Sequence, residues 1–355
     1  MKPELIIADL RSNCSYQGVS TGHFIPVAKM YYQLYNDNYS VKIAGGPVYE
    51  KYFDNSDLIK LPNNVSGDSW KHKIKILQNS LKLFRRIKGK TIIFQQSSDV
   101  TTHLALALFY WGGAKVYLIR YSNDGISSKF KQFIYFLCKN KIDGIICTSE
   151  SVGLSYKRKF IVVPDYIYID KEIDGHTKKI ETQKKYDFCI VGRIAKEKGI
   201  VEVARWIANR GFSIIIAGKT QTDELAQELQ VTCRNAENIT LKLGYISDEE
   251  YLSILHQSKY AFMNYQGEYS RRSSGVVFDT LFAGVPVIGT KCKALSFIEQ
   301  YEVGYLYDSL DNFDTKTVKK LLDESERSAF YNNIIKYRKT HVQFRERLTE
   351  FISSY

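Results

Sequence analysis

The sequence has no apolar run long enough to cross a lipid bilayer. A spanning helix needs about 18–20 consecutive apolar residues, and the nearest candidate, residues 104–119, is interrupted by Gly112, Gly113 and Lys115. The first eleven residues, MKPELIIADLR, lack the long apolar segment of a signal peptide and have the pattern of a strand. These absences argue against a membrane-spanning or secreted protein.

Cysteine is sparse, and its positions form no metal-binding or redox pattern. The six residues have no Cys-x-x-Cys spacing and lie far apart, at 14, 138, 147, 189, 233 and 292. We therefore expect reduced, mostly structural thiols in a cytoplasmic protein and no zinc site. The chain also lacks a short-period repeat, a clustered Asp-x-Asp pattern and a recognised nucleic-acid-binding module.

Acidic residues are scarce in the first half of the chain. Residues 1–170 hold 23 Lys and Arg against 13 Asp and Glu, and residues 171–355 hold 27 against 25, within a total net charge of +12. The first half therefore carries the basic surface. Nucleic acid, an anionic membrane face or an anionic small-molecule acceptor would each suit that charge.

Short apolar runs alternate with helical patterns along the whole chain. In the first half, residues 4–10, 40–46 and 114–120 have the composition of buried strands, and residues 69–87 and 128–140 have that of helices. Parallel strands need crossover connections, which are usually helices. The alternation therefore predicts an α/β protein with parallel sheets covered by helices on both faces.

One polar segment interrupts this alternation and predicts two domains. Residues 171–185 form the expected linker between a first Rossmann-like domain, 1–170, and a second, 186–313. A helical segment follows at 314–355, and the sequence allows it to cross back over the cleft between the domains. We expect two doubly wound domains that face each other across this cleft. Ligands of such sheets bind beyond the carboxyl ends of the strands.

The stretch VGRIAKEKG, at 191–199, has the features of an anion site. A buried strand ends before Gly192, which allows a tight turn, and Arg193 and Lys198 flank the opening of the next helix. A helix start offers N–H groups and partial positive charge to an anion. Arginine adds bidentate geometry and lysine a point charge, which suits a diphosphate. The alternative is an ordinary solvated turn with surface cations.

Four motifs follow one another in a specific order and spacing. They are VGRIAKEKG, FSIIIAGK at 212–219, ITLKLGYISDEEYLSILHQSKYAFMNY at 239–265 and SSGVVFDTLFAGVPVIGT at 273–290. Together they closely resemble the C-terminal half of GT-B glycosyltransferases, especially the retaining family 4. The resemblance is strong over about residues 186–310. In residues 1–170 only the topology and fragments such as CTSESV are similar.

The resemblance implies a donor site for a nucleotide sugar. In the family, the arginine and lysine of the G-R-x-x-x-x-K-G turn bind the donor diphosphate, and here they correspond to Arg193 and Lys198. The second glutamate of the family's E-x7-E motif holds the ribose, and Asp279 stands at its position. The first glutamate would fall at Arg271, so the sequence departs from the pattern there. Glu268 is the nearest acid, and a shift of the loop would bring it to the donor sugar.

The helix start within the fourth motif adds further groups for the donor phosphates. Ser273, Ser274 and Gly275 open a helix whose N–H groups suit phosphate, and Arg271 and Arg272 add positive charge that would stabilise the leaving diphosphate. The alternative makes Ser273 a plain N-cap and leaves the arginines in solvent.

The resemblance implies three further donor contacts. Tyr245 follows a strand where the family cradles the nucleotide base, and it would stack there, although a surface turn explains a tyrosine equally well. Gly18 and Gly22 lie in the loop 12–24, which in the family approaches the donor phosphates. Any turn between a strand and a helix could carry two such glycines.

The first half offers several titratable residues but no obvious catalytic histidine. Asp99 and Asp124 are expected at strand ends that face the cleft, where each is a candidate acid or orienting group. The family's histidine after the fourth strand is missing, since that region reads YLIRYSNDG. His103 falls one turn into a helix and is expected to be packed, and His23 is either a site residue or an exposed cap.

Two basic amphipathic segments raise the question of membrane contact. Residues 70–90 place Ile74, Leu77, Leu81 and Phe84 near one helical face among lysines and arginines, and residues 128–141 repeat this with more aromatic side chains. Such helices can lie on anionic membranes. The alternative is that their apolar stripes pack on the sheet while the cations face water.

These features predict a glycosyltransferase that takes a sugar from a nucleotide donor, most simply a UDP-sugar. The acceptor would be a hydroxyl of a glycan or lipid-linked glycan, as in cell-surface polysaccharide assembly. The resemblance implies retention of configuration and no required metal or other cofactor. Alternatives are a nucleotide-sugar epimerase, a phosphorylase, or a non-catalytic subunit that binds a nucleotide or a partner glycosyltransferase.

Overall fold

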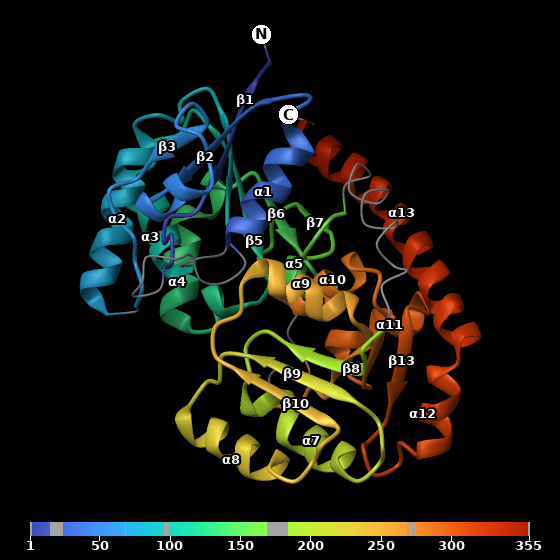
Figure 1. Ribbon diagram of the computed structural model, residues 1–355. Coiled ribbons are helices and arrows are strands. Elements are labelled where there is room, and N and C mark those ends of the chain that lie inside the picture. Colours follow the sequence, from blue (N-terminus) through green and yellow to red (C-terminus); the bar gives the residue numbers. More distant parts are fainter. Residues whose placement is uncertain are drawn as a thin grey trace. The chain divides into compact units, whose positions relative to one another are not determined.

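The computed structural model describes residues 2–14, 24–67, 69–95, 99–168, 184–267, 270 and 274–353 of the 355-residue chain. Two compact units make up the chain. The first comprises residues 1–169 together with 343–355, and the second comprises residues 170–342. Each unit contains its own parallel sheet (Figure 1). Nearly all of the expected linker lies outside the described residues.

The first unit is built on a seven-stranded parallel sheet in the order β3-β2-β1-β4-β5-β6-β7. In its centre, Ile7 pairs with Ile43 on one side and with Ile93 on the other. Strand β3 has three residues and was not predicted. The strands are β1 Glu4–Ala8, β2 Ser40–Gly45, β3 Leu58–Lys60, β4 Thr91–Phe94, β5 Lys115–Arg120, β6 Gly144–Cys147 and β7 Phe160–Val162.

Helices cover both faces of this sheet and create two cores. One core joins the sheet to α1 and to the end of α13, and the other joins it to α2, α3, α4 and α5. The α-helices are α1 Phe24–Tyr35, α2 Trp70–Phe84, α3 Asp99–Phe109, α4 Lys129–Cys138 and α5 Glu150–Ser155. Short 3-10 helices lie between them, at η1 Pro47–Lys51, η2 Asp124–Ile126 and η3 Lys139–Lys141.

The second unit repeats the plan with six parallel strands in the order β10-β9-β8-β11-β12-β13. Strand β13 was not predicted. The strands are β8 Tyr186–Val191, β9 Ile214–Gly218, β10 Ile239–Leu243, β11 Ser258–Met263, β12 Val287–Thr290 and β13 Gly304–Tyr307. The helices are η4 Lys196–Lys198, α7 Ile200–Ala208, α8 Asp223–Cys233, α9 Asp248–His256, α10 Gly275–Phe282, η6 Lys293–Leu295, α11 Ser296–Gln300 and α12 Thr315–Leu322.

The chain ends in a long helix, α13 Glu324–Ser353, as the sequence predicts for its tail. The part of this helix from residue 343 on belongs to the first unit. There the Tyr117 hydroxyl donates to the carbonyl oxygen of Phe351 at 3.3 Å, and Tyr39 and Ser353 share a hydrogen bond of 2.8 Å. These contacts attach the end of the chain to the first sheet.

Both sheets have the doubly wound order that the sequence predicts. In each, the strand order reverses between the first strand of the unit and the fourth, so the switch points lie between β1 and β4 and between β8 and β11. Ligands of such sheets bind beyond the carboxyl ends of the strands at these points. All six cysteines are free thiols. No helix within the described ranges is long and apolar enough to cross a membrane.

Candidate functional site

The turn after β8 lies at the switch point of the second sheet. Gly192 has φ +92°, which an L side chain rarely adopts, and its N–H donates to the carbonyl of Ala217 at 3.1 Å. Two positions further, the N–H of Ile194 donates to the carbonyl of Lys219 at 2.9 Å. A Cβ on Gly218 would lie only 1.8 Å from the Gly192 oxygen. The end of β9 thus packs directly against this turn and fixes its path.

Arg193 and Lys198 extend from this turn in two different environments. Arg193 is exposed, whereas Lys198, at the end of η4, is only 7% exposed. Burial, with the nearby charge of Arg193 as a second cause, lowers the pKa of the Lys198 ammonium from 10.5 to about 8. No carboxylate in the described part of the chain forms an ion pair with Arg193. Because the charge of Arg193 disfavours the charged form of Lys198, an anion that binds beside both cations would relieve this repulsion.

Asn264 holds the segment that carries Lys198, and it was not predicted from the sequence. Its Nδ2 donates to the carbonyl of Gly199 at 3.1 Å, and its Oδ1 accepts a hydrogen bond from the Tyr307 hydroxyl at 3.0 Å. Gly199 has φ +56°, and a Cβ there would lie 2.3 Å from Asn264 Nδ2. In the sequence, the only signal is a polar residue directly after the apolar run of β11.

The start of α10 lies beside the turn after β8. Ser274 is the N-cap and Gly275 the first helical residue, so the alternative that made Ser273 the cap is wrong. The Ser274 hydroxyl does not cap the helix itself, because it shares a 2.7 Å hydrogen bond with the Tyr265 hydroxyl. A Cβ on Gly192 would lie 3.3 Å from Val276 Cγ2. The first-turn N–H groups of α10 therefore lie next to the turn that carries Arg193.

Asp279 lies one turn further along α10 and contacts α9. The Tyr251 hydroxyl donates to Asp279 Oδ2 at 3.1 Å. Burial, and after it the charge of Asp279, raises the pKa of Tyr251 well above its ordinary value, so the phenol stays a donor. Tyr251 was not foreseen, because nothing in the local pattern of α9 marks it. The half-buried carboxylate is thereby fixed in one orientation.

Tyr245 follows β10 at the same end of the sheet. The N–H of Gly244 donates to the carbonyl of Gly218 at 2.9 Å, which attaches this loop to the strand end that packs on Gly192. The Tyr245 side chain is 77% exposed. Its ring is therefore accessible for stacking on a nucleotide base, as the resemblance implies. The same exposure is typical of a tyrosine in a surface turn.

Other predicted site residues fall outside this arrangement. Gly18, Gly22, His23, Glu268, Arg271, Arg272 and Ser273 lie outside the described residues. Asp124 belongs to the first unit, where it is exposed at the start of η2 and accepts a hydrogen bond from the Ser122 hydroxyl at 2.9 Å. Asp99 begins α3.

His103 is buried in the first unit, as expected for a packed residue. Its Nε2 lies 3.2 Å from Arg120 Nη2. Burial, followed by the charge of Arg120, lowers the pKa of His103 well below 6.5. The imidazole is therefore neutral, and the surrounding side chains keep it away from solvent.

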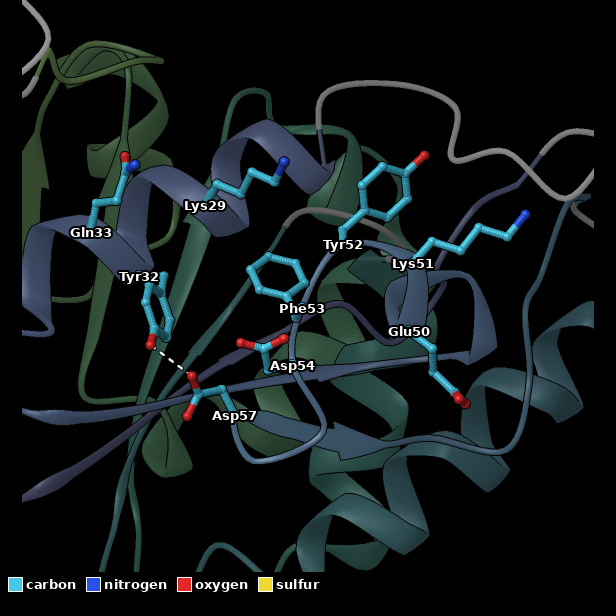
Figure 2. A pocket seen from close by; sticks show the side chains of 9 residues that line it. All are labelled: Lys29, Tyr32, Gln33, Glu50, Lys51, Tyr52, Phe53, Asp54 and Asp57. Carbon is cyan, nitrogen blue, oxygen red and sulfur yellow. Dashed lines mark hydrogen bonds between the residues drawn. The ribbon is translucent and has the colours of Figure 1, made fainter.

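A separate hollow of about 440 Å³ opens on the first unit, between α1 and the segment around η1 (Figure 2). Its aromatic side chains are Tyr32, Tyr52 and Phe53, and the Tyr32 hydroxyl donates to Asp57 Oδ2 at 2.7 Å. The remaining lining residues are polar or charged: Lys29, Gln33, Glu50, Lys51 and Asp54. Aromatic faces beside carboxylates and an amide can bind the apolar faces and hydroxyls of a sugar.

No group of three or more His, Cys, Asp or Glu side chains that could hold a metal ion occurs in the ranges that the structure describes.

A search of solved structures gives matches over nearly the whole chain. Trehalose-6-phosphate synthase OtsA matches with a TM-score of 0.73 and 9% identity over 99% of both chains. The pneumococcal O-GlcNAc transferase GtfA, in complex with UDP and GlcNAc, matches with a TM-score of 0.67 and 11% identity over 99% of both chains. Anabaena HepE, in complex with UDP-glucose, matches with a TM-score of 0.62 and 11% identity over 99% of this chain and 100% of that one.

The chain has the GT-B fold. This confirms the predicted fold class, two doubly wound domains of the GT-B type. The likeness is one of structure, because a scan against protein-family models and a search of curated proteins give no match.

Proposed function

We propose that the protein is a glycosyltransferase that moves a sugar from a nucleotide donor to a hydroxyl of a glycan or lipid-linked glycan. The nucleotide is UDP, since the solved structures with a similar fold include proteins in complex with UDP or UDP-glucose. Retention of configuration follows from the sequence resemblance to family 4. A GT-B fold alone hosts more than one chemistry, so the proposal depends on the site in the second unit.

The observation that carries the proposal is the meeting of three positive groups at one switch point. The exposed guanidinium of Arg193, the buried ammonium of Lys198 and the N–H groups at the start of α10 lie around Gly192. When the bond between the anomeric carbon and the diphosphate breaks, negative charge grows on the diphosphate. Positive groups that are already in place stabilise that charge without reorganising, which lowers the barrier.

The other proposed donor contacts lie at the same end of the second sheet. Asp279, fixed by Tyr251, would accept hydrogen bonds from the ribose hydroxyls, and Tyr245 would stack on uracil. The resemblance alone supports a role in donor binding for five further residues, which are Glu268, Arg271, Ser273, Gly18 and Gly22. With Arg193 and Lys198 as the counter-charge, we expect turnover to persist in the presence of a metal chelator.

The acceptor is proposed to bind the first unit. The hollow lined by Tyr52 and its neighbours has the aromatic and carboxylate groups that would hold a sugar of the acceptor (Figure 2). Asp124 remains a candidate for orienting the acceptor hydroxyl.

The excess of basic residues in the first half of the chain supports a location at the inner face of a membrane. A peripheral contact with anionic lipid would bring the enzyme to a lipid-linked glycan, as in the assembly of cell-surface polysaccharide.

The test is a turnover assay with a panel of UDP-sugars, with and without glycan acceptors, in which released UDP and sugar products are measured. UDP release that increases with one acceptor supports transfer. Conversion of one UDP-sugar to another without release of UDP would show an epimerase. Release of a sugar product that depends on inorganic phosphate would show a phosphorylase. Nucleotide binding without any turnover would show a non-catalytic subunit.

A further inference from the structure

Helices α2, α3 and α4 share one side of the first sheet. Their inward residues, such as Ile76, Leu106 and Tyr135, belong to one core, and α3 packs against both of the other helices. The opposite sides of these helices therefore point away from the sheet, and Figure 1 shows the three helices on one side of it. We call these opposite sides the outer helical face. Its exposed apolar side chains are Trp70, Ile74, Leu81, Leu108, Trp111, Phe130, Phe133, Phe136 and Leu137.

This face holds most of the large apolar side chains that the described residues expose. Nine of the twelve lie on it, and two of the other three, Val231 and Tyr245, lie in the second unit. On α4, Phe130, Phe133 and Phe136 are 68%, 58% and 62% exposed. Their spacing of three residues places them along one stripe of the helix. Exposed apolar patches of this kind mark surfaces that contact a membrane or another molecule.

Trp111 follows the end of α3 and is 93% exposed. It lies in the turn that ends α3, beside Gly112 with φ +94° and Gly113 with φ +86°. The N–H of Gly89, after α2, donates to the carbonyl of Gly113. The Lys141 ammonium, after α4, donates at 2.7–3.0 Å to the carbonyls of Leu106, Ala107 and Tyr110. The ends of all three helices therefore meet around this tryptophan.

The charge of this region is almost entirely positive. Residues 69–142, which contain the three helices, hold 14 Lys and Arg but only two acids, Asp99 and Asp124. Cations also lie over the exposed rings. The Lys71 ammonium is 5.9 Å from the Trp70 ring centre, and the Lys139 ammonium is 4.7 Å from that of Phe136.

We propose that the outer helical face docks on an anionic phospholipid bilayer, with Trp111 and the phenylalanines of α4 at headgroup depth. Lysines attract the anionic surface, and aromatic rings concentrate at membrane–water interfaces. A second copy of the chain fits poorly, because two such faces would bring like charges together. The proposal deepens the membrane contact of the proposed function by naming its lipid partner and the inserting residues, but docking itself requires no nucleotide.

The test is co-sedimentation of the full chain with vesicles of phosphatidylcholine, with and without phosphatidylglycerol, at low and high salt. We expect binding that depends on phosphatidylglycerol and weakens in salt. The triple variant Phe130→Ser/Phe133→Ser/Phe136→Ser should bind at least about tenfold more weakly. Val231→Ser, which removes an exposed apolar side chain of α8, should bind as the unchanged chain does. Circular dichroism of all variants separates lost binding from lost folding.

Trp111 provides a second readout. The chain has only two other tryptophans, Trp70 and the buried Trp206, so Trp70→Phe leaves Trp111 as the exposed reporter. A blue shift of its emission on adding anionic vesicles, with quenching by brominated lipid, would support insertion.

The proposal is wrong if the unchanged chain stays in solution with anionic vesicles at low salt, or if the triple variant binds as strongly. It is also wrong if the triple variant still binds the vesicles and loses only its self-association or its binding to an acidic protein. Stabilisation by UDP, measured without vesicles, tests the proposed function separately, so either idea can fail alone.

Discussion

The Tyr251 hydroxyl donates a 3.1 Å hydrogen bond to Asp279 Oδ2, which connects α9 to α10 at the end of the second sheet. This bond fixes the orientation of the carboxylate at the carboxyl end of the second sheet, where ligands of such sheets bind. A hydrogen bond to a charged group that is positioned in this way contributes about 1.5–3 kcal/mol.

This relationship predicts that Asp279→Ala weakens UDP binding by at least about tenfold through the ribose. Tyr251→Phe should weaken it less, because the carboxylate remains but loses its support. Calorimetric titration with UDP and 2′-deoxy-UDP identifies the contact. If the 2′-hydroxyl is the partner, Asp279→Ala should bind the two nucleotides equally. A variant that unfolds more easily but binds UDP normally would make Asp279 purely structural.

The lowered pKa of Lys198 predicts a pH dependence of nucleotide binding. Only the ammonium attracts a diphosphate, and it loses its proton as the pH rises through about 8. UDP affinity should therefore be nearly constant between about pH 7 and 8, where the terminal phosphate of UDP is fully ionised, and fall by up to about tenfold per pH unit above that range. Lys198→Arg, whose guanidinium keeps its charge, is the matched control and should show a flat profile. The same decline in both proteins would contradict the assignment.

The same pKa has the opposite effect on the stability of the ligand-free protein. The folded state favours the neutral amine, whereas an unfolded lysine keeps its proton to about pH 10.4. Between about 8 and that value the unfolded chain binds more protons, so the contribution of Lys198 to the free energy of unfolding rises with pH. Urea unfolding of the original chain and of Lys198→Met at pH 7 and 9.5 measures this difference. An equal pH response in the two proteins would rule the effect out.

Close packing at Gly192 predicts a functional cost for an added methyl group. Gly192→Ala forces an L side chain to φ +92°, at about 1–2 kcal/mol, and places its Cβ 3.3 Å from Val276 Cγ2 at the start of α10. Gly211→Ala is the control, since Gly211 has φ +71° but no atom within 4 Å of the added Cβ. Both variants should lose stability in urea unfolding. Only Gly192→Ala should also lose UDP affinity, and a similar loss in Gly211→Ala would show a general effect.

The hollow on the first unit predicts a change in acceptor use alone. Tyr52→Ala removes an aromatic face and should raise KM for a glycan acceptor about tenfold while leaving KM for the donor unchanged. Tyr52→Phe keeps the ring and should behave nearly as the original chain. Steady-state kinetics with the acceptor found in the turnover assay decides the matter. An unchanged acceptor KM in Tyr52→Ala would place the acceptor elsewhere.

Much of the fold could be predicted, because strands of a parallel sheet are buried on both faces and appear as apolar runs. Strand β8, Tyr186–Val191, and the turn at Gly192 follow directly from such a run. Strands β3 (LIK) and β13 (GYLY) were missed because they contain only one β-branched residue between them, Ile59, whereas the equally short β7 (FIV) contains two. Periodicity carries little information over so short a length.

The site could be predicted only where its residues are neighbours in the sequence. Arg193 and Lys198 belong to one turn, whereas Asn264 and Tyr251 reach the site because β11 pairs with β8 and α9 packs beside them. The amphipathic pattern of α2 was also ambiguous. Ile76 and Leu83 face the core while Ile74 and Leu81 are exposed, because both sides of this helix carry apolar residues.

The most direct test of the donor site is thermal stabilisation by UDP, GDP, ADP and CMP, measured on the original chain and on Arg193→Ala/Lys198→Ala. A nucleotide at a hundred times its Kd stabilises the folded state by about 2.7 kcal/mol, which a melting curve resolves. We predict that UDP stabilises the original chain and that this stabilisation disappears in the double variant. Without ligand, the melting temperatures of the two proteins at pH 7 should agree to within a few degrees. No stabilisation by any nucleotide, or equal stabilisation of both proteins by UDP, would contradict a donor site at Arg193 and Lys198.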